Sequence, residues 1–341
     1  MTGESAEPYL RFVIAGCLNR DYILPVSGPP QINVLGGNLA YAAAGLSLWE
    51  ATAGLVARVG RDFPVQWLQP FEAADFDLTG VRILDGEMDT RRFMAHADAV
   101  TTYHDNPVQH FAERGLTFPP ALLSYQPKPK NISSRTTPLR QSIQISDIPE
   151  SYLEASAVHI CPIDYLSHTI LPSVFRQGQA TTITLSPAPG YMSPSFWEEI
   201  PGLLSDITAF IVTEADLRRL FQGRSADLWE MAEATGAFGP EFVLIRTVNA
   251  GYFVYDRPSN KRWVVPEYTV TDADPTGLMD AFAGGFLAGY REHYEPMEAA
   301  LMGAIGASLV VEGSGVFYAW GAMPGLMAAR LDALRALVRQ I

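Results

Sequence analysis

The strongest constraint on the fold is a repeated alternation of short apolar runs with longer, small-residue helical patterns. Residues 11–17 (RFVIAGC) predict a buried strand, 37–48 (GNLAYAAAGLSL) a helix, and 53–59 a second strand. Such a succession requires parallel strands with helices on the sheet faces. Further strands are predicted at 157–161, 181–185, 207–212, 242–247 and 251–255, and helices at 214–221, 226–235, 278–293, 297–312 and 324–341. The sequence therefore predicts one α/β domain spanning residues 1–341.

Two regions depart from this alternation. Residues 81–103 alternate like antiparallel strands, which predicts a small sheet beside the main one. Residues 104–150 contain seven prolines and little periodicity. They are interpreted as a long insertion or excursion, a kind of segment that is often functional.

Composition excludes several classes of function. With 24 Lys and Arg against 37 Asp and Glu, the net charge is −13, so no basic field favours nucleic acid or a membrane surface as partner. Two cysteines, Cys17 and Cys161, cannot form a disulfide framework. The polar N-terminal residues lack the pattern of a secretory signal, and a cytoplasmic protein is expected.

Lysine is rare, since only Lys128, Lys130 and Lys261 occur. None follows a glycine-rich turn, as a P-loop would require, and none lies in an apolar run that could bury a Schiff-base amine. Both mechanisms are therefore disfavoured.

The most informative motif is DPTGLMDAF at residues 274–282, which leads into a glycine-rich helix. The first-turn N–H groups of a helix lack helical partners and can bind an anion. A carboxylate at Asp280 could take a proton from a substrate hydroxyl. The simpler alternative is that Asp280 only complements the helix dipole.

Two further segments combine glycine with polar side chains. Gly36 and Gly37 precede Asn38 and an alanine-rich helix, so a ligand could approach the backbone there, although a tight turn would need the same residues. Asn19 and Asp21 follow the first strand, where they could bind hydroxyl groups or simply form a turn.

The order and spacing of these segments resemble the ribokinase-like sugar and nucleoside kinases, the PfkB family. The resembling segments are Gly16-x-x-Asn19-x-Asp21, Gly36-Gly37-x-x-Ala40 with Val59-Gly60-Arg61-Asp62, and Asp274-x-x-Gly277-x-x-Asp280-Ala281-Phe282-x-x-Gly285. The resemblance spans residues 13–315 and implies a three-layer αβα sandwich with a small β-sheet lid, to which 81–103 would contribute strands.

The resemblance also implies ATP and Mg²⁺ as cofactors and a role for each motif. Asp280 would be the general base, and backbone N–H groups from Gly277, Leu278 and Met279 to Asp280 would form the anion hole. The expected substrate-binding residues are Asn19, Asp21, Gly36, Gly37, Asn38 and Tyr41; Thr247, Asn249, Gly251 and Asp274 would serve the nucleotide, and Thr213 and Asp216 the metal. A homodimer through the lid is a further expectation.

The chain departs from the family pattern at several of these positions. Leu278 and Met279 stand where the family has Ala and Gly, Pro275 replaces a Thr, and Asn249 replaces a glycine. Thr213 and Asp216 stand in for an Asn-x-x-Glu metal motif, and Tyr41 for a residue that is often Asn. These changes support a second hypothesis, a sugar- or nucleoside-binding protein with impaired or lost kinase activity. A third is a metal-dependent hydrolase using Asp274 and Asp280.

Other side-chain patterns point to packing. The six histidines show no zinc-binding spacing, and His159, within an apolar strand, is expected to be a hydrogen-bonded core residue. Leu331, Leu334, Val338 and Ile341 would form one packing stripe on the last helix.

Overall fold

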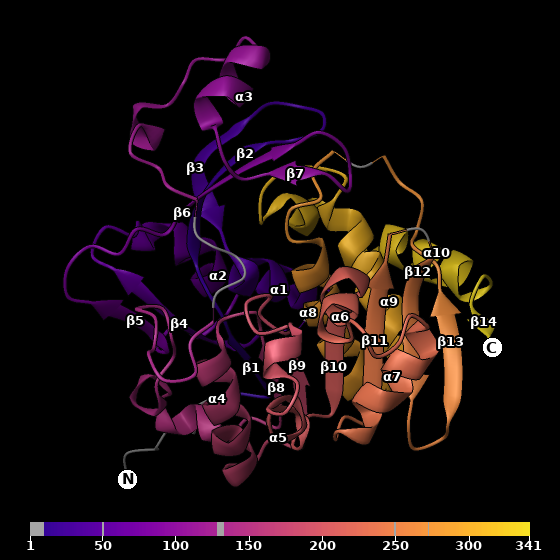
Figure 1. Ribbon diagram of the computed structural model, residues 1–341. Coiled ribbons are helices and arrows are strands. Elements are labelled where there is room, and N and C mark those ends of the chain that lie inside the picture. Colours follow the sequence, from indigo (N-terminus) through magenta and orange to yellow (C-terminus); the bar gives the residue numbers. More distant parts are fainter. Residues whose placement is uncertain (1–9, 50, 128–132, 249, 272) are drawn as a thin grey trace, which may run out of the picture.

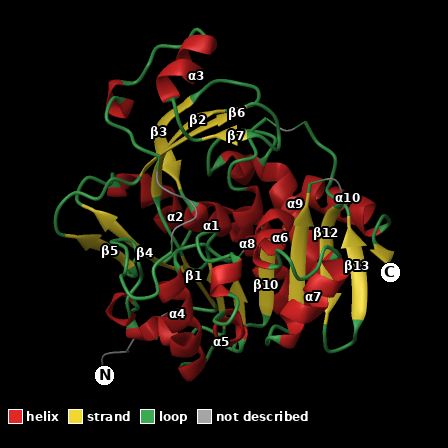
Figure 2. Cartoon of the chain, in the orientation of Figure 1, coloured by secondary structure: helices red, strands yellow, loops and turns green. Residues whose placement is uncertain are grey.

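A ten-stranded sheet with helices on both faces forms the body of the protein (Figures 1 and 2). In the computed structural model, residues 10–49, 51–127, 133–248, 250–271 and 273–341 are described. The strand order is β14-β13-β12-β11-β10-β9-β8-β1-β4-β5. The strands are β1 (Phe12–Ala15), β4 (Gly54–Gly60), β5 (Val81–Leu84), β8 (Ala157–Ile160), β9 (Thr182–Leu185), β10 (Ala209–Thr213), β11 (Phe242–Thr247), β12 (Gly251–Asp256), β13 (Lys261–Val265) and β14 (Arg339–Gln340).

Alternate residues of the central strands supply two separate cores, which explains their continuous apolar sequence. From β1, Phe12 and Ile14 join the core beneath one helical layer, whereas Val13 and Ala15 join the other. The first layer holds α1 (Asn38–Ser47), α2 (Gln69–Ala73), α8 (Leu278–His293), α9 (Pro296–Val310) and α10 (Pro324–Arg335). The second holds α4 (Tyr165–Gln177), α5 (Ile200–Leu204), α6 (Glu214–Leu220) and α7 (Leu228–Ala237). The predicted three-layer αβα fold is confirmed.

Helices α1 and α8 pack with their backbones in contact. A Cβ atom on Gly284 would lie 1.9 Å from the Ala42 carbonyl oxygen, and one on Gly45 would lie 2.1 Å from that of Ala281. No side chain fits in so small a gap, so glycine is required at both positions. This contact brings the N-termini of the two helices together at one edge of the sheet.

A separate four-stranded sheet, in the order β3-β2-β6-β7, lies over that edge (Figure 2). It comprises β2 (Asn19–Leu24), β3 (Gln31–Gly36), β6 (Arg91–His96) and β7 (Thr102–Tyr103). Side chains on its inner face bond toward the start of α8, as His96 does to Thr276 at 2.8 Å. On its outer face, Tyr22, Leu24 and Phe93 form a small core with Phe111 of α3 (Pro107–Glu113) and with Leu122. The excursion therefore covers the outer face of the small sheet.

Several local predictions were wrong. Residues 81–103 divide between the sheets, because β5 pairs in parallel with β4 at the edge of the large sheet and only β6 and β7 enter the small one. Residues 19–24 and 31–36, for which no strand was predicted, are strands, and β2 pairs in parallel with β6. The C-terminal helix ends at Arg335, and β14 follows, so Val338 and Ile341 lie beyond the helical stripe.

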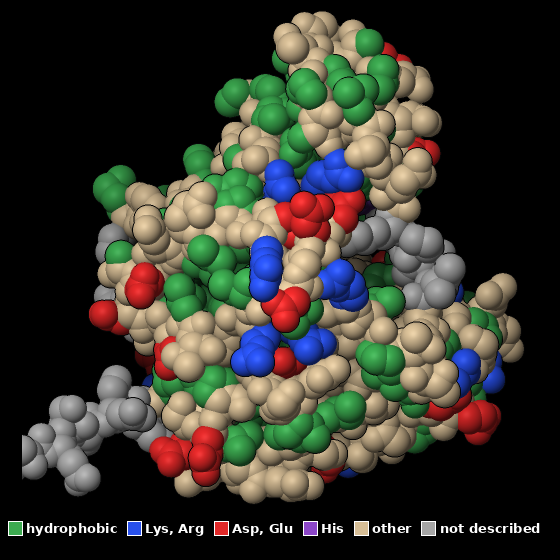
Figure 3. All heavy atoms as spheres, turned by 90° about the vertical axis from the view of Figure 1, so that its left-hand side faces the viewer, with side chains coloured by type: hydrophobic (Ala, Val, Ile, Leu, Met, Phe, Trp, Pro, Cys, Tyr) green, Lys and Arg blue, Asp and Glu red, His purple; other side chains and the backbone are tan. Residues whose placement is uncertain are grey.

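The molecular surface mixes charges of both signs. Acidic and basic side chains lie beside one another on the face shown in Figure 3, and exposed pairs such as Arg61–Asp85, at 2.5 Å, neutralise each other locally. Among the described residues, no helix combines the length and apolar character needed to cross a membrane.

The covered outer face yields a stability prediction. Phe111→Ala should destabilise the protein by about 3 kcal/mol, because it empties the centre of a small closed core; Phe111 is 1% exposed. Val108→Ala, on the same helix but 59% exposed, is the matched control and should change the free energy of unfolding by less than about 0.5 kcal/mol. Urea unfolding measures both, and equal effects would contradict the assignment of this core.

Candidate active site

A cavity of about 430 Å³ lies between the small sheet and the carboxyl ends of the central strands. Three groups of side chains line it. The small sheet and the excursion contribute Asn19, Arg91, Arg92, His104, Tyr125 and Gln141; the starts of α1 and α8 contribute Asn38, Met279 and Asp280; and the segments after β8, β9 and β10 contribute Pro162, Ser186, Thr213 and Asp216, among others. The position matches the rule that ligands bind at the carboxyl ends of parallel strands.

The first turn of α8 forms the floor of this cavity. Gly277 is the N-cap with φ of 80°, and the Tyr41 ring fills the space that a Cβ atom would need, 2.1 Å away. The first helical bond runs from the Ala281 N–H to the Gly277 carbonyl at 2.8 Å. The N–H groups of Met279 and Asp280 precede that bond, as helix geometry requires, and have no partner within the helix. This end of α8 is therefore suited to an anion.

Leu278 and Met279 face different surroundings. Leu278 lines a separate small gap beside Tyr252 and Tyr268, whereas Met279 lines the cavity next to Asp280. Of these two residues, only Met279 therefore adds a side chain to the wall of this cavity.

The pKa of the Asp280 carboxyl group is raised far above its usual value. Burial raises its pKa to about 7; the Arg92 guanidinium opposes this effect, and the Asp21 carboxylate adds to it. A carboxyl group with a pKa near neutrality is suited to general base catalysis at physiological pH.

Arg92 is a site residue that sequence reasoning missed. Its Nη2 lies 3.3 Å from Asp21 Oδ2, and its buried Nε has no hydrogen-bond partner among the described residues. Burial alone would lower the pKa of Arg92, but Asp21 and Asp280 together raise it above its usual value. The two adjacent arginines at 91 and 92 could have indicated a charged site in the sequence. Only the pairing of β6 with β2, however, places Arg92 beside Asp21.

The expected substrate residues divide into those that line the cavity and those that support it. Asn19 and Asn38 line the cavity, and Asn38 also holds the loops around it, accepting from the Cys17 N–H at 2.7 Å and donating to the Pro162 carbonyl at 2.6 Å. Asp21 is fully buried beside Arg92, and burial raises its pKa.

The remaining expected substrate residues serve close packing. A Cβ atom on Gly36 would lie 1.9 Å from Asp21 Oδ2, and one on Gly37 would lie 2.2 Å from the Cys17 carbonyl. Tyr41 is buried beneath Gly277 and is not among the side chains that line the cavity. Burial raises the pKa of its hydroxyl well above the usual value.

Asp274 lies away from the nucleotide side where it was expected. Its Oδ1 is 3.3 Å from His96 Nε2 and accepts from the Thr276 N–H at 3.0 Å. Burial alone would raise the pKa of Asp274, but these hydrogen bonds lower it. Asp274 therefore joins the segment before α8 to the small sheet, an arrangement that does not support a metal shared with Asp280.

The expected metal residues do line the cavity. Thr213 caps α6, and its hydroxyl bonds to Asp216 Oδ2 at 2.7 Å, while Asp216 Oδ1 pairs with Arg219 at 2.7 Å. No group of three or more His, Cys, Asp or Glu that could hold a metal occurs in the described part of the chain. The oxygens of Thr213 and Asp216 at the cavity wall fit Mg²⁺, which commonly takes one or two carboxylates together with substrate phosphates and waters.

The other nucleotide-side residues shape a turn. Thr247 Oγ1 accepts from the Ala250 N–H at 3.0 Å and donates to the Gly251 carbonyl at 3.1 Å, closing the connection between β11 and β12. Gly251 has φ of 79°. Asn249 lies outside the described residues. The turn lies at the same edge of the sheet as Thr213, because β10 and β11 are parallel and Thr213 pairs in register with Arg246.

The chain is similar to known kinases in sequence and in structure. It is 29% identical over 286 residues to a cytidine kinase from Thermococcus kodakarensis, covering 82% of this chain and 88% of that protein. An E. coli structure described as a ribokinase II in complex with ATP and Mg²⁺ superposes with a TM-score of 0.69 at 14% identity, covering 95% of this chain and 99% of that one. A Burkholderia thailandensis nucleoside kinase in complex with inosine gives 0.65 at 14% identity, with the same coverage.

A family model described as pfkB family carbohydrate kinase matches residues 143–320, just over half of the chain. The match includes the start of α8 and the segments after β8, β9 and β10, which build the cavity. The order of the sequence motifs predicted the same family. The chain belongs to the pfkB family of carbohydrate kinases.

Proposed function

We propose that this protein transfers the γ-phosphoryl group of ATP to a hydroxyl of a small sugar or nucleoside, with Asp280 as the general base. The observation that carries the proposal is the cavity-facing Asp280 in the first turn of α8, with its pKa near 7. Membership of the family and the similarity to a cytidine kinase support phosphorylation of a sugar or nucleoside.

Each group at the site would have a defined task. Asp280 would accept the hydroxyl proton as the oxygen attacks the phosphoryl group, and Arg92 would limit the cost of a second negative charge near Asp21. Backbone N–H groups at the start of α8 would bind the phosphoryl oxygens. Thr213 and Asp216 would hold Mg²⁺, which neutralises phosphate charge when it is bound.

The alternative, a binding protein with impaired or lost kinase activity, depends on Met279. Its side chain lines the cavity next to the proposed anion hole, where close approach of phosphate is needed. The N–H donors belong to the backbone, however, and do not depend on the side chain.

A homodimer through the small sheet remains a proposal. The excursion covers the outer face of that sheet, so a partner would have to meet its edge strands, β3 or β7. Ile32 and Tyr103 on these edges are 39% and 45% exposed.

The role of Asp280 is tested by Asp280→Asn. The variant should lower kcat by at least about 100-fold, the usual contribution of a general base, because a carboxamide cannot accept the proton. Circular dichroism should show an unchanged fold. Activity within a few-fold of wild type on the same substrate would refute the assignment.

The raised pKa of Asp280 predicts how this substitution changes stability with pH. A carboxyl whose folded pKa lies above its unfolded value favours the folded state when protonated and disfavours it as the pH rises through that interval, here from about 4 to 7. Asp280→Asn should match wild type near pH 4 and be more stable at pH 8, by at most about 4 kcal/mol. Asp85→Asn, at an exposed site, is the control and should show no such trend in thermal unfolding.

Met279→Ala distinguishes an active kinase from a binding protein whose kinase activity is impaired or lost. If the anion hole works through the backbone, kcat should stay within about threefold of wild type, because alanine keeps both the N–H donor and the helix. An increase of about tenfold or more in the rate of phosphoryl transfer would show that Met279 obstructs the site, as the alternative requires.

A further inference from the structure

A second compartment adjoins the cavity that contains Asp280. It measures about 570 Å³ and shares Gln141, Pro162 and Pro189 with the first cavity. Its exposed surface is largely apolar and includes Met88, Leu139 and Ile163, although charged side chains (Glu87, Asp89, Arg140 and Asp164) also line it. Each compartment has the size of a typical small-ligand site.

Gln141 stands at the boundary of the two compartments. Its side chain is half-buried, and none of the described residues hydrogen-bonds to its amide. A primary amide presents one acceptor and two donors, so Gln141 brings a complete hydrogen-bonding group, unengaged by any described residue, to the boundary of the compartment.

The segment that carries Gln141 is held in place by buried contacts. The Ser142 hydroxyl donates to the Asp164 carboxylate, and the Ser142 carbonyl accepts from Arg58 Nη1 at 3.1 Å. The Ile143 N–H donates to Ser167 Oγ at 3.0 Å. The backbone at Gln141 is therefore fixed before any ligand binds.

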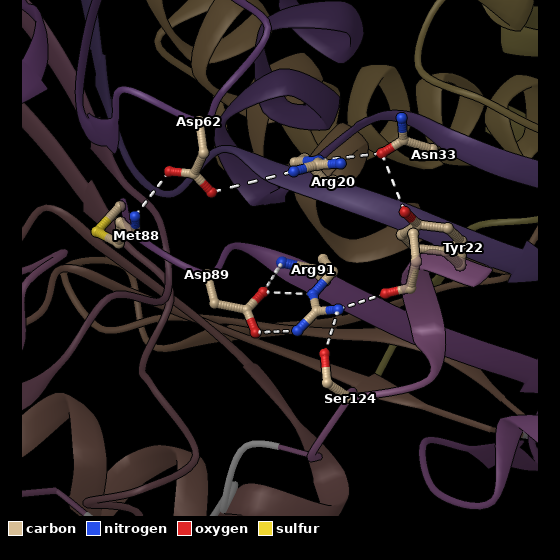
Figure 4. Close-up of polar contacts among 9 residues, drawn as sticks. Arg20, Tyr22, Asn33, Asp62, Met88, Asp89, Arg91 and Ser124 are labelled. Carbon is tan, nitrogen blue, oxygen red and sulfur yellow. Dashed lines mark hydrogen bonds and ion pairs between the residues drawn. The ribbon is translucent and has the colours of Figure 1, made fainter. Parts of the chain in front are cut away.

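Residues 87–89, which also line the compartment, are fixed in the same way. Arg140 donates to the Asp85 carbonyl at 2.8 Å and the Glu87 carbonyl at 2.9 Å. The Met88 N–H donates to Asp62 Oδ1 at 2.7 Å, and Asp89 pairs with Arg91 at 2.7 Å (Figure 4). A compartment with both of these lining segments anchored is preformed for a rigid ligand.

We propose that this second compartment binds the nucleobase of a nucleoside and that Gln141 recognises the hydrogen-bonding edge of the base. A free pentose would occupy only the first cavity, whereas a planar heterocycle suits a largely apolar surface with an amide at its boundary. Glutamine and asparagine amides pair with adjacent donor and acceptor atoms on a base edge. Arg140 and Asp164, which also line the compartment, are engaged with protein partners. Glu87 and Asp89 add carboxylates to the lining, so the compartment favours a neutral group over an anionic one.

This inference rests on the proposed function for the reaction at Asp280, but binding can be tested without turnover. Isothermal titration calorimetry should compare cytidine, uridine, adenosine, inosine and D-ribose in the absence of ATP. At least one nucleoside should bind roughly 100-fold more tightly than D-ribose, because only the nucleosides fill both compartments.

Substitution of Gln141 tests the recognition of the base. Gln141→Leu should weaken the preferred nucleoside roughly 10- to 100-fold, the contribution of a bidentate amide–base pair, and should leave D-ribose unchanged. Gln141→Glu replaces two donors by acceptors and should change the ranking of the bases. Gln66→Leu, an exposed glutamine outside both compartments, is the matched control and should leave all affinities unchanged.

The outcomes separate this inference from the kinase assignment. Equal affinity for D-ribose and all four nucleosides, or a Gln141→Leu variant with wild-type nucleoside affinity, would overturn the base site. Tight nucleoside binding without phosphoryl transfer from ATP would support the base site and refute the kinase. Phosphorylation of free sugars with no nucleoside binding would refute the base site and support the kinase.

Discussion

The backbone contact between α1 and α8 is the constraint on which the site depends. Gly45 and Gly284 allow the two helices to approach until carbonyl oxygens of one meet the Cα atoms of the other. Their N-termini consequently lie side by side at the carboxyl edge of the sheet, with the Tyr41 ring packed under Gly277. The small residues that follow each motif are thus needed for packing, and the packing places Asp280 and Asn38 on one cavity.

The charged side chains at this edge of the sheet lower the stability of the fold but supply the groups for the proposed chemistry. Asp21 and Asp280 are held close to each other in a largely desolvated place, and both have raised pKa values. Arg92, supplied by the small sheet, is the positive charge shared between them. Because this charge comes from a different element, the position of the small sheet directly affects how readily Asp280 ionises. Functional sites commonly retain such unfavourable groups.

The parts that sequence predicted well are those encoded locally. Apolar runs and helical periods gave most of the main sheet and its helices, and His159 is the buried, hydrogen-bonded residue that was expected, 2.8 Å from Thr184. The small sheet was predicted, but its strands β2 and β3 were missed, because they are short and polar at their starts and become strands only by pairing with each other and with β6. Tyr41 and Asp274 were expected to bind ligands but are buried in packing and hydrogen-bonding roles, which spacing along the chain does not reveal.

The sequence by itself determined the α/β fold and the chemical groups at the start of α8, since a glycine before a first-turn aspartate has the same local consequence in any helix. Tertiary structure alone decided which groups share the cavity. Arg92 reaches Asp21 across 71 positions of the chain, and Gln141 reaches the boundary between compartments because buried contacts of Ser142 and Ile143 hold its segment. The physical reason is that contacts between distant segments depend on strand pairing and helix packing of the whole chain, which no local pattern specifies.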